Sequence, residues 1–495
     1  MHHVILGAGP AGVTAAETIR NQDPSAEITL VAGEGEPPYS RMAIPYLLEG
    51  KIGEDGTYLR QTKDHYQEQA IKVVEGPTTA VDTGAKSVSL KDGSTLSYDK
   101  LLIATGASPV RPPIDGLDQP GVHTCWTLDD ARYITERAQK DAPVVLVGAG
   151  FIGSIILESL AKAGVKLTVI EMGDRMVPRM LDETAGNMLK RWCEDQGVRV
   201  ITGTTVEAIR ATGAAAPAPA PGTADQAQSQ GEAGESARQE QGFFGRLFGM
   251  SSSQPSPSSY PASGAAPAAP TTNDNTPVAS GDGLQVALGN GETIDASLVV
   301  IATGVRSNTA FLDGSGIKVG NGITVDDHLA TSASDVYAAG DVAEGMDLST
   351  GAHDMLAIQP VAVEHGYLAA MNMVGKPTRH RGSLNMNVLD TLGLISSSFG
   401  QWQGVDGGDS VAKVDDDNYR YIRLEFGGDK LVGAQCIGMT ENIGMLRGLI
   451  QTGLSLGPWK ERLLEAPERL PEAYVATAQG TPSHGPSGPK IALPV

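Results

Sequence analysis

The sequence predicts an α/β fold with two units of parallel strands and helices, and two observations support it. Two β-branched runs, starting near residues 3 and 144, each lead into a Gly-x-Gly-x-x-Gly motif and then into a helical pattern. A second predicted strand follows each helix, at residues 28–32 and 166–170. One such motif is weak evidence, but two in the correct position between strand and helix indicate a duplicated dinucleotide-binding βαβ unit.

The first unit runs from a strand at residues 3–6 through a glycine loop at residues 7–12 into a helix that ends near Arg20. Glycines there let the backbone approach a pyrophosphate at the helix N-terminus, where the helix dipole favours negative charge. An acidic residue at the end of the second strand would bind ribose hydroxyls, and Glu34 stands in that place. The alternative for Glu34 is a solvated loop carboxylate.

The second unit repeats this order, with a strand at residues 144–147, a glycine loop at residues 148–153 and a helix to about Ala163. Glu171 ends its second strand. A carboxylate there would bond a free 2′-hydroxyl and repel a 2′-phosphate, which favours NADH over NADPH. Arg175 follows in the next loop and could weaken that preference.

Composition and residue spacing exclude several other classes of protein. Lys and Arg number 37 against 58 Asp and Glu, a net charge of −21, which argues against a nucleic-acid partner. The three cysteines lie far apart, so we predict no disulfide scaffold, iron–sulfur cluster or redox dithiol. The histidines lack metal-ligand spacing, and we predict no metal site. Without a signal peptide or a long apolar span, a soluble cytoplasmic protein with no transmembrane segment is expected.

Residues 211–281 differ from the rest, being rich in Ala, Pro, Ser, Gly and Gln, and we predict that they are disordered because they cannot form an apolar core. Predicted strands on both sides, at residues 204–209 and 284–288, make this segment a long insertion in a hairpin loop. Its stretch from Phe243 to Phe248 is either a hydrophobic accident or a docking segment, and its role stays open. Near the C-terminus, alternating strands precede a helix near residues 441–452.

Further segments resemble those of one flavoprotein family. Leu101–Gly106 and Val299–Gly304 resemble its paired Ala-Thr-Gly strands, and Thr331–Asp341 resembles its second FAD signature. Pro37–Tyr46 resembles the segment beside the flavin, and Tyr421–Gly438 resembles the C-terminal interface domain. The chain is thus similar to the FAD-dependent pyridine nucleotide-disulfide oxidoreductases. Within that family it resembles NADH oxidases, coenzyme A-disulfide reductases, rubredoxin and ferredoxin reductases and the flavoprotein domain of nitrite reductases.

The resemblance implies two Rossmann-like dinucleotide-binding domains, with the NAD domain inserted in the FAD domain, and a C-terminal α+β interface domain. The expected FAD domain comprises residues 1–113 and 304–378, and the expected NAD domain comprises residues 114–303. Residues 379–478 would form a domain used for dimerisation, followed by a flexible tail at residues 479–495.

The resemblance and the two glycine loops together give a set of candidate cofactor-binding residues. The candidates for FAD are Gly7, Gly9, Pro10, Ala11, Gly12, Glu34, Arg41, Ala104, Thr105, Gly106, Gly340 and Asp341. The candidates for NAD are Gly148, Gly150, Phe151, Ile152, Gly153, Glu171 and Gly304. No catalytic residue is assigned, because a flavin carries the chemistry itself.

The chain also departs from the family pattern. Met42 stands where the resemblance implies a redox cysteine, and a thioether cannot form a disulfide or a sulfenic acid. Residues 467–474 lack the family's His–Glu pair, and Ile155 replaces a glutamate near the nicotinamide. Trp126 replaces an arginine and is expected to be a packing residue. Phe151 would either gate the nicotinamide slot or belong to the core.

A helix is expected over residues 358–373, with its N-terminus aimed at the charge that develops on a reduced flavin. His365 within it could bond the flavin, although a helix-surface or interface position is favoured. The predicted function is an FAD-dependent NAD(P)H oxidoreductase that moves hydride from NADH to FAD and then electrons to an acceptor, without a protein disulfide. The acceptor would be an electron-carrier protein, a small oxidant or O2, and its identity stays open.

The alternative function is an NADH-responsive flavoprotein sensor or binding module with slow turnover. A third possibility, a subunit that feeds a larger complex, shares the enzyme chemistry. A homodimer is expected from the C-terminal domain.

Overall fold

The computed structural model describes residues 1–212 and 283–479. The predicted insert with its Phe-rich stretch, and the predicted tail, lie outside the described residues except at their ends. Ala211 is not part of a disordered segment, because it pairs with Leu284 in a regular strand. Gln479 is the last residue of a helix rather than the first of a tail.

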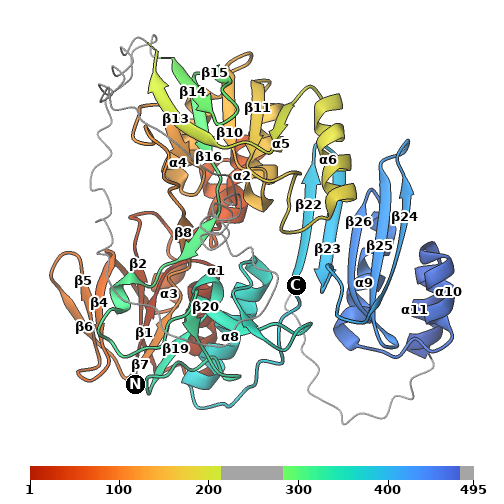
Figure 1. Cartoon of the computed structure of the whole chain (residues 1–495). Coiled ribbons are helices and arrows are strands. Elements are labelled where there is room, and N and C mark those ends of the chain that lie inside the picture. The colour runs from red at the N-terminus through yellow and green to blue at the C-terminus, as the bar shows by residue number, and fades with distance from the viewer. Residues whose placement is uncertain (213–282, 480–495) are drawn as a thin grey trace, which may run out of the picture. The chain divides into compact units, whose positions relative to one another are not determined.

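The first sheet consists of β1 (His2–Leu6), β2 (Glu27–Ala32), β3 (Ile71–Glu75), β7 (Lys100–Ile103) and β19 (Val336–Ala338). Its strands are parallel and lie in the order β19-β7-β1-β2-β3, so β19 pairs with β7 although the two are far apart in the sequence (Figure 1). Val4, Ile5 and Leu6 are fully buried. Such continuous burial is typical of a parallel sheet that is covered on both faces.

Two helices of the first unit pack tightly against each other, namely α1 (Pro10–Gln22) and α8 (Gln359–Met373). A Cβ atom at Gly366 of α8 would lie 2.3 Å from the carbonyl oxygen of Ala11, so only glycine allows this approach. The helix predicted over residues 358–373 is confirmed, with Ile358 as its N-cap. The smaller sheets of this part are β4-β5-β6 (Thr78–Asp82, Ser87–Leu90, Thr95–Ser97) and β18-β20-β21 (Ile323–Thr324, Ala343–Met346, His353–Asp354).

The second sheet repeats the parallel arrangement with β9 (Val122–Thr124), β10 (Pro143–Val147), β11 (Lys166–Glu171), β12 (Arg199–Thr202) and β16 (Leu298–Ile301). Its order is β12-β11-β10-β16-β9. Its helices are α4 (Leu128–Arg137), α5 (Phe151–Lys162) and α6 (Glu183–Asp195). The hairpin strands β13 (Val206–Ala211) and β14 (Leu284–Leu288) pair with each other, and β15 (Thr293–Ala296) follows. The insertion therefore interrupts a hairpin, as predicted.

The two parallel sheets are joined by a two-stranded antiparallel ribbon. It consists of β8 (Ala107–Pro109), which follows β7, and β17 (Val305–Ser307), which follows β16. The ribbon is extended at one end by a hydrogen bond from Asn308 N–H to Gly106 O, and at the other by one from Val110 N–H to Gly304 O, both of 2.9 Å.

An antiparallel sheet forms the C-terminal part, drawn in blue in Figure 1. Its strands are β22 (Met386–Thr391), β23 (Leu394–Gly400), β24 (Asp409–Asp415), β25 (Arg420–Gly427) and β26 (Lys430–Ile437), in the order β22-β23-β26-β25-β24. Helices α9 (Ile443–Thr452), α10 (Trp459–Glu465) and α11 (Leu470–Gln479) follow. The predicted fold class, two Rossmann-like sheets and a C-terminal α+β part, is confirmed. Among the described helices, none is long and apolar enough to cross a membrane.

Candidate cofactor site

The two glycine loops have nearly the same geometry, and both need glycine at their ends. Gly7 and Gly148 have φ angles of +106° and +101°, which other residues rarely adopt. A Cβ atom at Gly12 would lie 1.9 Å from Gly7 O, and one at Gly153 would lie 2.0 Å from Gly148 O. These contacts draw each helix start against its loop, as a dinucleotide site requires.

The middle glycines of both loops face open space. A Cβ atom at Gly9 or Gly150 would meet no other atom within 4 Å. Helix α1 begins at Pro10 and α5 at Phe151, and neither N-terminus has a side-chain cap. The N–H groups of the first turn are therefore available to an anion, and these residues fit the pyrophosphate groups of FAD and NADH.

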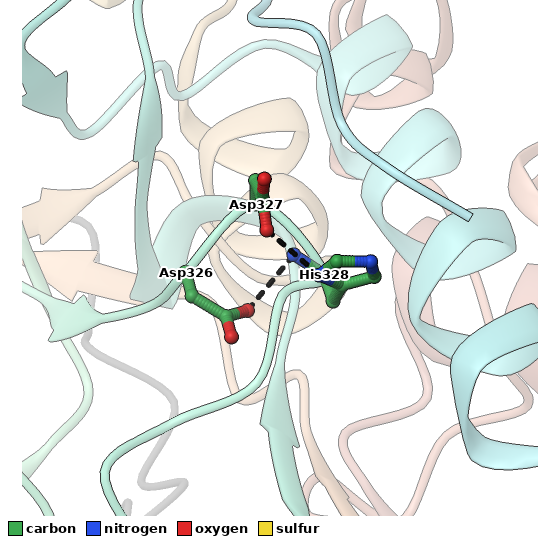
Figure 2. A group of neighbouring side chains, drawn as sticks. All are labelled: Asp326, Asp327 and His328. Carbon is green, nitrogen blue, oxygen red and sulfur yellow. Dashed lines mark hydrogen bonds and ion pairs between the residues drawn. The ribbon is translucent and has the colours of Figure 1, made fainter. Parts of the chain in front are cut away.

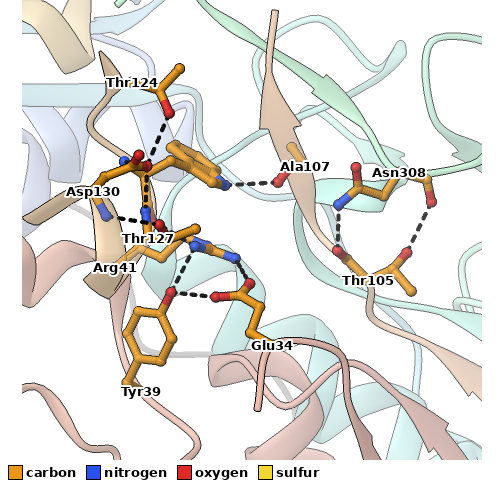
Figure 3. Close-up of polar contacts among 10 residues, drawn as sticks. Glu34, Tyr39, Arg41, Thr105, Ala107, Thr124, Thr127, Asp130 and Asn308 are labelled. Atoms are coloured by element: carbon orange, nitrogen blue, oxygen red, sulfur yellow. Dashed lines mark hydrogen bonds and ion pairs between the residues drawn. The ribbon is translucent and has the colours of Figure 1, made fainter. Parts of the chain in front are cut away.

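The carboxylate of Glu34 does not lie free in a loop, because two neighbours bind it (Figure 3). The Tyr39 hydroxyl donates to Glu34 Oε2 at 2.6 Å, and Arg41 forms an ion pair with Glu34 Oε1. Arg41 Nη1 also donates to the Tyr39 hydroxyl oxygen at 2.9 Å. Burial raises the pKa of the Tyr39 phenol, which keeps this group protonated and able to donate.

The carboxylate of Glu171 is bound by backbone of its own unit. Its Oε2 accepts from Ala149 N–H at 2.7 Å and its Oε1 accepts from Gly173 N–H at 2.8 Å. Arg175 donates to Leu181 O at 3.0 Å and to the Asp174 carboxylate at 2.7 Å. Those two contacts already engage the Arg175 guanidinium with protein groups.

The second FAD signature lies beside the first glycine loop. Gly340 has a φ of +74°, and a Cβ atom there would lie 3.2 Å from the Ala11 side chain. Asp341 therefore stands near the start of α1. Burial raises the pKa of its carboxyl, and the nearby Arg41 opposes that shift. Ser307 Oγ donates to the Asp341 carbonyl at 2.9 Å, which ties the signature to the ribbon.

The remaining candidates lie where strands leave the sheets. A Cβ atom at Gly7 would lie 2.1 Å from Ala104 O, so Ala104 borders the first loop. Thr105 Oγ1 donates to Asn308 O at 3.0 Å, and Asn308 Nδ2 donates to Thr105 O at 2.9 Å. Gly304 directly precedes β17, with a φ of +104°.

Met42 and the cysteines have opposite environments. Met42 is 47% exposed in the 3-10 turn η1 (Arg41–Ala43), just before α2 (Ile44–Leu48). Cys125, Cys193 and Cys436 are buried and free. Burial raises the pKa of the Cys193 and Cys436 thiols to about 12 and that of Cys125 still further. A buried neutral thiol is a poor nucleophile, so none of the three is suited to redox exchange.

His365 is neither on the helix surface nor bonded to another group. Its side chain is 2% exposed between α8 and β20, and neither ring nitrogen has a hydrogen-bond partner among the described residues. Its ring centroid lies 4.7 Å from that of His380. The sequence favoured a helix-surface or interface position, and the surface position is wrong, because α8 packs this face against Gly345 of β20.

One group of described side chains, Asp326, Asp327 and His328, brings three possible metal-ligand atoms within 4.8 Å of one another (Figure 2). These atoms already bind protein groups. Asp327 pairs with His328 Nδ1 at 2.7 Å and with Arg379, and Asp326 Oδ1 accepts from His328 N–H at 2.8 Å. We assign no metal to this group.

Several of these contacts were missed by sequence reasoning. Tyr39 and Asn308 carried no motif of their own, and Trp126 was expected only to pack. The signal available for Tyr39 was its position beside Arg41 in the flavin-side segment, whereas no local signal exists for Asn308.

Comparison with known proteins identifies the family. The model of the pyridine nucleotide-disulphide oxidoreductase family matches residues 1–229 and 271–355. The chain belongs to this family. It is an FAD-dependent NAD(P)H oxidoreductase that uses FAD and NADH.

Two relatives and one solved structure illustrate the range of its similarity. The chain is 28% identical over 468 residues to the NADH-dependent phenylglyoxylate dehydrogenase subunit epsilon of Aromatoleum evansii, covering 94% of this chain and 95% of that protein. It is 31% identical over 217 residues to the ferredoxin–NAD(+) reductase subunit of the benzene 1,2-dioxygenase system of Pseudomonas putida, covering 43% of this chain and 52% of that protein.

The covalent complex of putidaredoxin reductase with putidaredoxin has a chain similar in fold, with a TM-score of 0.75 and 21% identity, covering 96% of this chain and 99% of that one. At this identity the likeness concerns the fold alone. The alternative of an NADH-responsive sensor finds no support in these comparisons.

Proposed function

We propose that this oxidoreductase passes electrons from its flavin directly to an electron-transfer protein, with no thiol of the chain taking part. The observation that carries the proposal is the contrast between the half-exposed Met42 and the three buried cysteines. A bound flavin accepts hydride from a nicotinamide and releases electrons singly or in pairs, so no second redox group is needed.

The two glycine loops would hold the two dinucleotides. The N–H groups at the starts of α1 and α5 would bind the pyrophosphates, and Glu34 and Glu171 would bind ribose hydroxyls. Arg41 would bring positive charge to the FAD pyrophosphate, and Asp341 would hold the ribityl chain. The N-terminus of α8 would stabilise negative charge on the reduced ring. The full set of candidates named from the sequence remains part of this proposal.

The acceptor that we propose is a small electron-carrier protein. The Pseudomonas putida relative named as a ferredoxin–NAD(+) reductase subunit supports this class, although the match covers 52% of that protein. A small oxidant and O2 are the competing acceptors. The net charge of −21 would slow the approach of a strongly acidic carrier unless positive charge is gathered at the docking face.

An anaerobic titration of the FAD-loaded chain with NADH tests the proposal. If flavin is the sole redox group, about one equivalent of NADH per FAD should bleach the visible band completely. A dithiol that shares the electrons would require about a second equivalent. The same titration with NADPH should proceed more slowly, because of Glu171. Failure of NADH to bleach the flavin would contradict the proposed function.

A second candidate is a place within a larger enzyme. The Aromatoleum evansii relative is named as a subunit, and its similarity spans almost the whole of both chains. In that case the electrons would flow between a partner subunit and the nicotinamide through this flavin. Mild affinity purification from the native source distinguishes the two. Stoichiometric partner chains that survive gel filtration would favour the subunit, and a lone flavoprotein would favour the free reductase.

We also propose that the chain forms a cytoplasmic homodimer through its C-terminal sheet. The domain limits proposed from the sequence, with breaks near residues 113, 303 and 378, lie outside the strands and helices that the structure describes. Light scattering of the purified chain tests the dimer.

A further inference from the structure

Trp126 connects three parts of the described chain, namely the turn that contains Arg41, the ribbon strand β8 and the start of α4. Its indole Nε1–H donates to Ala107 O of the ribbon strand β8 at 3.1 Å. Its backbone carbonyl accepts from Arg41 Nη1 at 2.6 Å. The central guanidinium carbon of Arg41 also lies 5.1 Å from the Trp126 ring centroid, which is within the range of a cation–π contact.

The backbone at Trp126 is fixed by the start of α4. Asp130 Oδ2 accepts from the N–H groups of Trp126 and Thr127, both at 3.0 Å, and from Thr124 Oγ1 at 2.9 Å. Thr127 and Asp130 form a capping box, in which each side chain binds the backbone of the other. The carbonyl that holds Arg41 therefore cannot move without disrupting the N-terminus of this helix.

Arg41 keeps free donors after these contacts. A guanidinium carries five N–H donors, and in Arg41 three of them donate hydrogen bonds to Glu34, Tyr39 and Trp126. Its Nε–H and second Nη2–H have no hydrogen-bond partner within residues 1–212 and 283–479. A planar fork that is held in place on one side and free on the other suits a phosphate group, which it can bind through two parallel hydrogen bonds.

We propose that Trp126 is a positioning residue, which holds Arg41 in place for the FAD pyrophosphate and links that contact to the β8–β17 ribbon. This inference rests on the proposed FAD site. A fixed guanidinium loses less side-chain entropy when it binds a phosphate than a mobile one does. The hydrogen bond from the indole N–H to Ala107 O holds the Trp126 ring in place, and the face of that ring attracts the Arg41 guanidinium.

The inference differs from the packing role that the sequence suggested. If Trp126 only fills space, its replacement would affect FAD affinity whether or not Arg41 is present. If it acts through Arg41, the effect of replacement disappears once Arg41 has been removed. A double-mutant cycle separates these two cases.

The test uses Trp126→Phe, which keeps an aromatic ring and the backbone carbonyl but removes the indole N–H. The matched control is Trp192→Phe, because the Trp192 indole N–H also donates to a backbone carbonyl, Thr391 O at 3.1 Å, from a partly buried site on α6. The dissociation constant of FAD from the full chain is measured by the quenching of flavin fluorescence. Thermal unfolding of the FAD-free protein shows whether each variant is folded.

We expect Trp126→Phe to weaken FAD binding about fivefold, the effect of one lost hydrogen bond and a weaker cation–π contact. Trp192→Phe should leave FAD affinity within about twofold. Arg41→Ala should weaken FAD binding about thirtyfold, as expected for a charge-assisted phosphate contact. In the Arg41→Ala background, adding Trp126→Phe should change affinity less than about twofold. An equal fivefold loss in both backgrounds would overturn the proposal.

The link to the ribbon has its own readout. FAD should slow hydrogen exchange at the Val110 and Asn308 amides, which donate across the ribbon at 2.9 Å. In Trp126→Phe this protection by FAD should be reduced, and unchanged protection would refute the link. If the unaltered chain fails to bind FAD, the proposed function itself is wrong. If it binds FAD and Trp126→Phe binds equally well, only this inference fails.

Discussion

The two glycine loops make nearly the same contacts, but the carboxylates that follow them differ in their binding partners. Glu34 in the first unit is paired with Arg41 and bound by the Tyr39 hydroxyl. Among the described residues, Glu171 in the second unit is bound by uncharged backbone, the N–H groups of Ala149 and Gly173. The first carboxylate has a cationic partner, and the second has two peptide N–H donors.

This difference shows that a shared motif fixes backbone geometry but not the charge of a site. A cation beside the first loop suits a dinucleotide that stays bound, because it adds a phosphate contact. A carboxylate without a cationic partner beside the second loop suits a dinucleotide that must exchange and must be distinguished from its 2′-phosphorylated form.

The largest effects are expected at the third glycines. In Gly12→Ala the new Cβ would lie 1.9 Å from Gly7 O, and in Gly153→Ala 2.0 Å from Gly148 O. We expect a loss of about 3 kcal/mol in the free energy of unfolding for each, as for severe overpacking. Gly12→Ala should lose FAD, whereas Gly153→Ala should keep FAD but resist reduction by NADH. Flavin content, urea unfolding and anaerobic bleaching measure the three effects.

The middle glycines provide the control for this pair. Because a Cβ atom at Gly9 or Gly150 meets no other atom within 4 Å, alanine there should leave stability within about 1 kcal/mol. It would still intrude into the space left for the pyrophosphate and weaken cofactor binding. Normal reduction of Gly153→Ala by NADH would remove the second loop from consideration as the NADH site.

The next effect concerns the choice of nucleotide. Glu171→Ala should lower kcat/KM for NADH about tenfold, the value of a charge-assisted hydrogen bond, and lower kcat/KM for NADPH much less. The preference for NADH would therefore narrow. Glu34→Ala serves as the counterpart. It should alter FAD retention and leave the ratio of kcat/KM for NADH to kcat/KM for NADPH unchanged. A ratio that shifts equally in both variants would refute the assignment of Glu171.

The sequence predicted the two loops, their helices and both carboxylates, because these depend on local spacing along the chain. It did not predict how the carboxylates are bound. Glu34 is bound by Arg41, and the position of Arg41 is set in turn by Trp126. Arg41 and Trp126 are far apart in the sequence and are brought together by the tertiary fold. The burial of His365 was missed for the same reason, since the strand that covers it, β20, is a separate element and contacts the ring at Gly345.

Acid should affect the first unit through its buried histidines. Burial lowers the pKa of His365 to about 3 and that of His3 to about 4. The unfolded chain binds these protons near pH 6.5, so below that value the unfolded state holds more protons and stability falls as the pH falls. Each histidine contributes a slope of about 1.4 kcal/mol per pH unit between its two pKa values.

His365→Leu should reduce the slope of unfolding free energy against pH by about 1.4 kcal/mol per pH unit, the contribution of one proton. The pH dependence above pH 7 should not change. Urea unfolding at a series of pH values between about 7.5 and 5 measures it. The matched control is His353→Ala, which removes an exposed ring and shows how far the loss of any histidine alters the slope. An unaltered slope in His365→Leu would mean that this ring gains its proton in the folded chain as easily as in the unfolded one.

The smallest effect is expected at Met42. It follows Arg41, the partner of Glu34, in the turn η1. Its side chain is 47% exposed, so Met42→Ala should change the free energy of unfolding by less than about 1 kcal/mol. Because no electrons pass through a thioether, the rate of flavin reduction by NADH should stay within about twofold, as should that of Met42→Leu. Stopped-flow bleaching measures both. A collapse of the rate in Met42→Ala but not in Met42→Leu would show that this side chain shapes the nicotinamide contact.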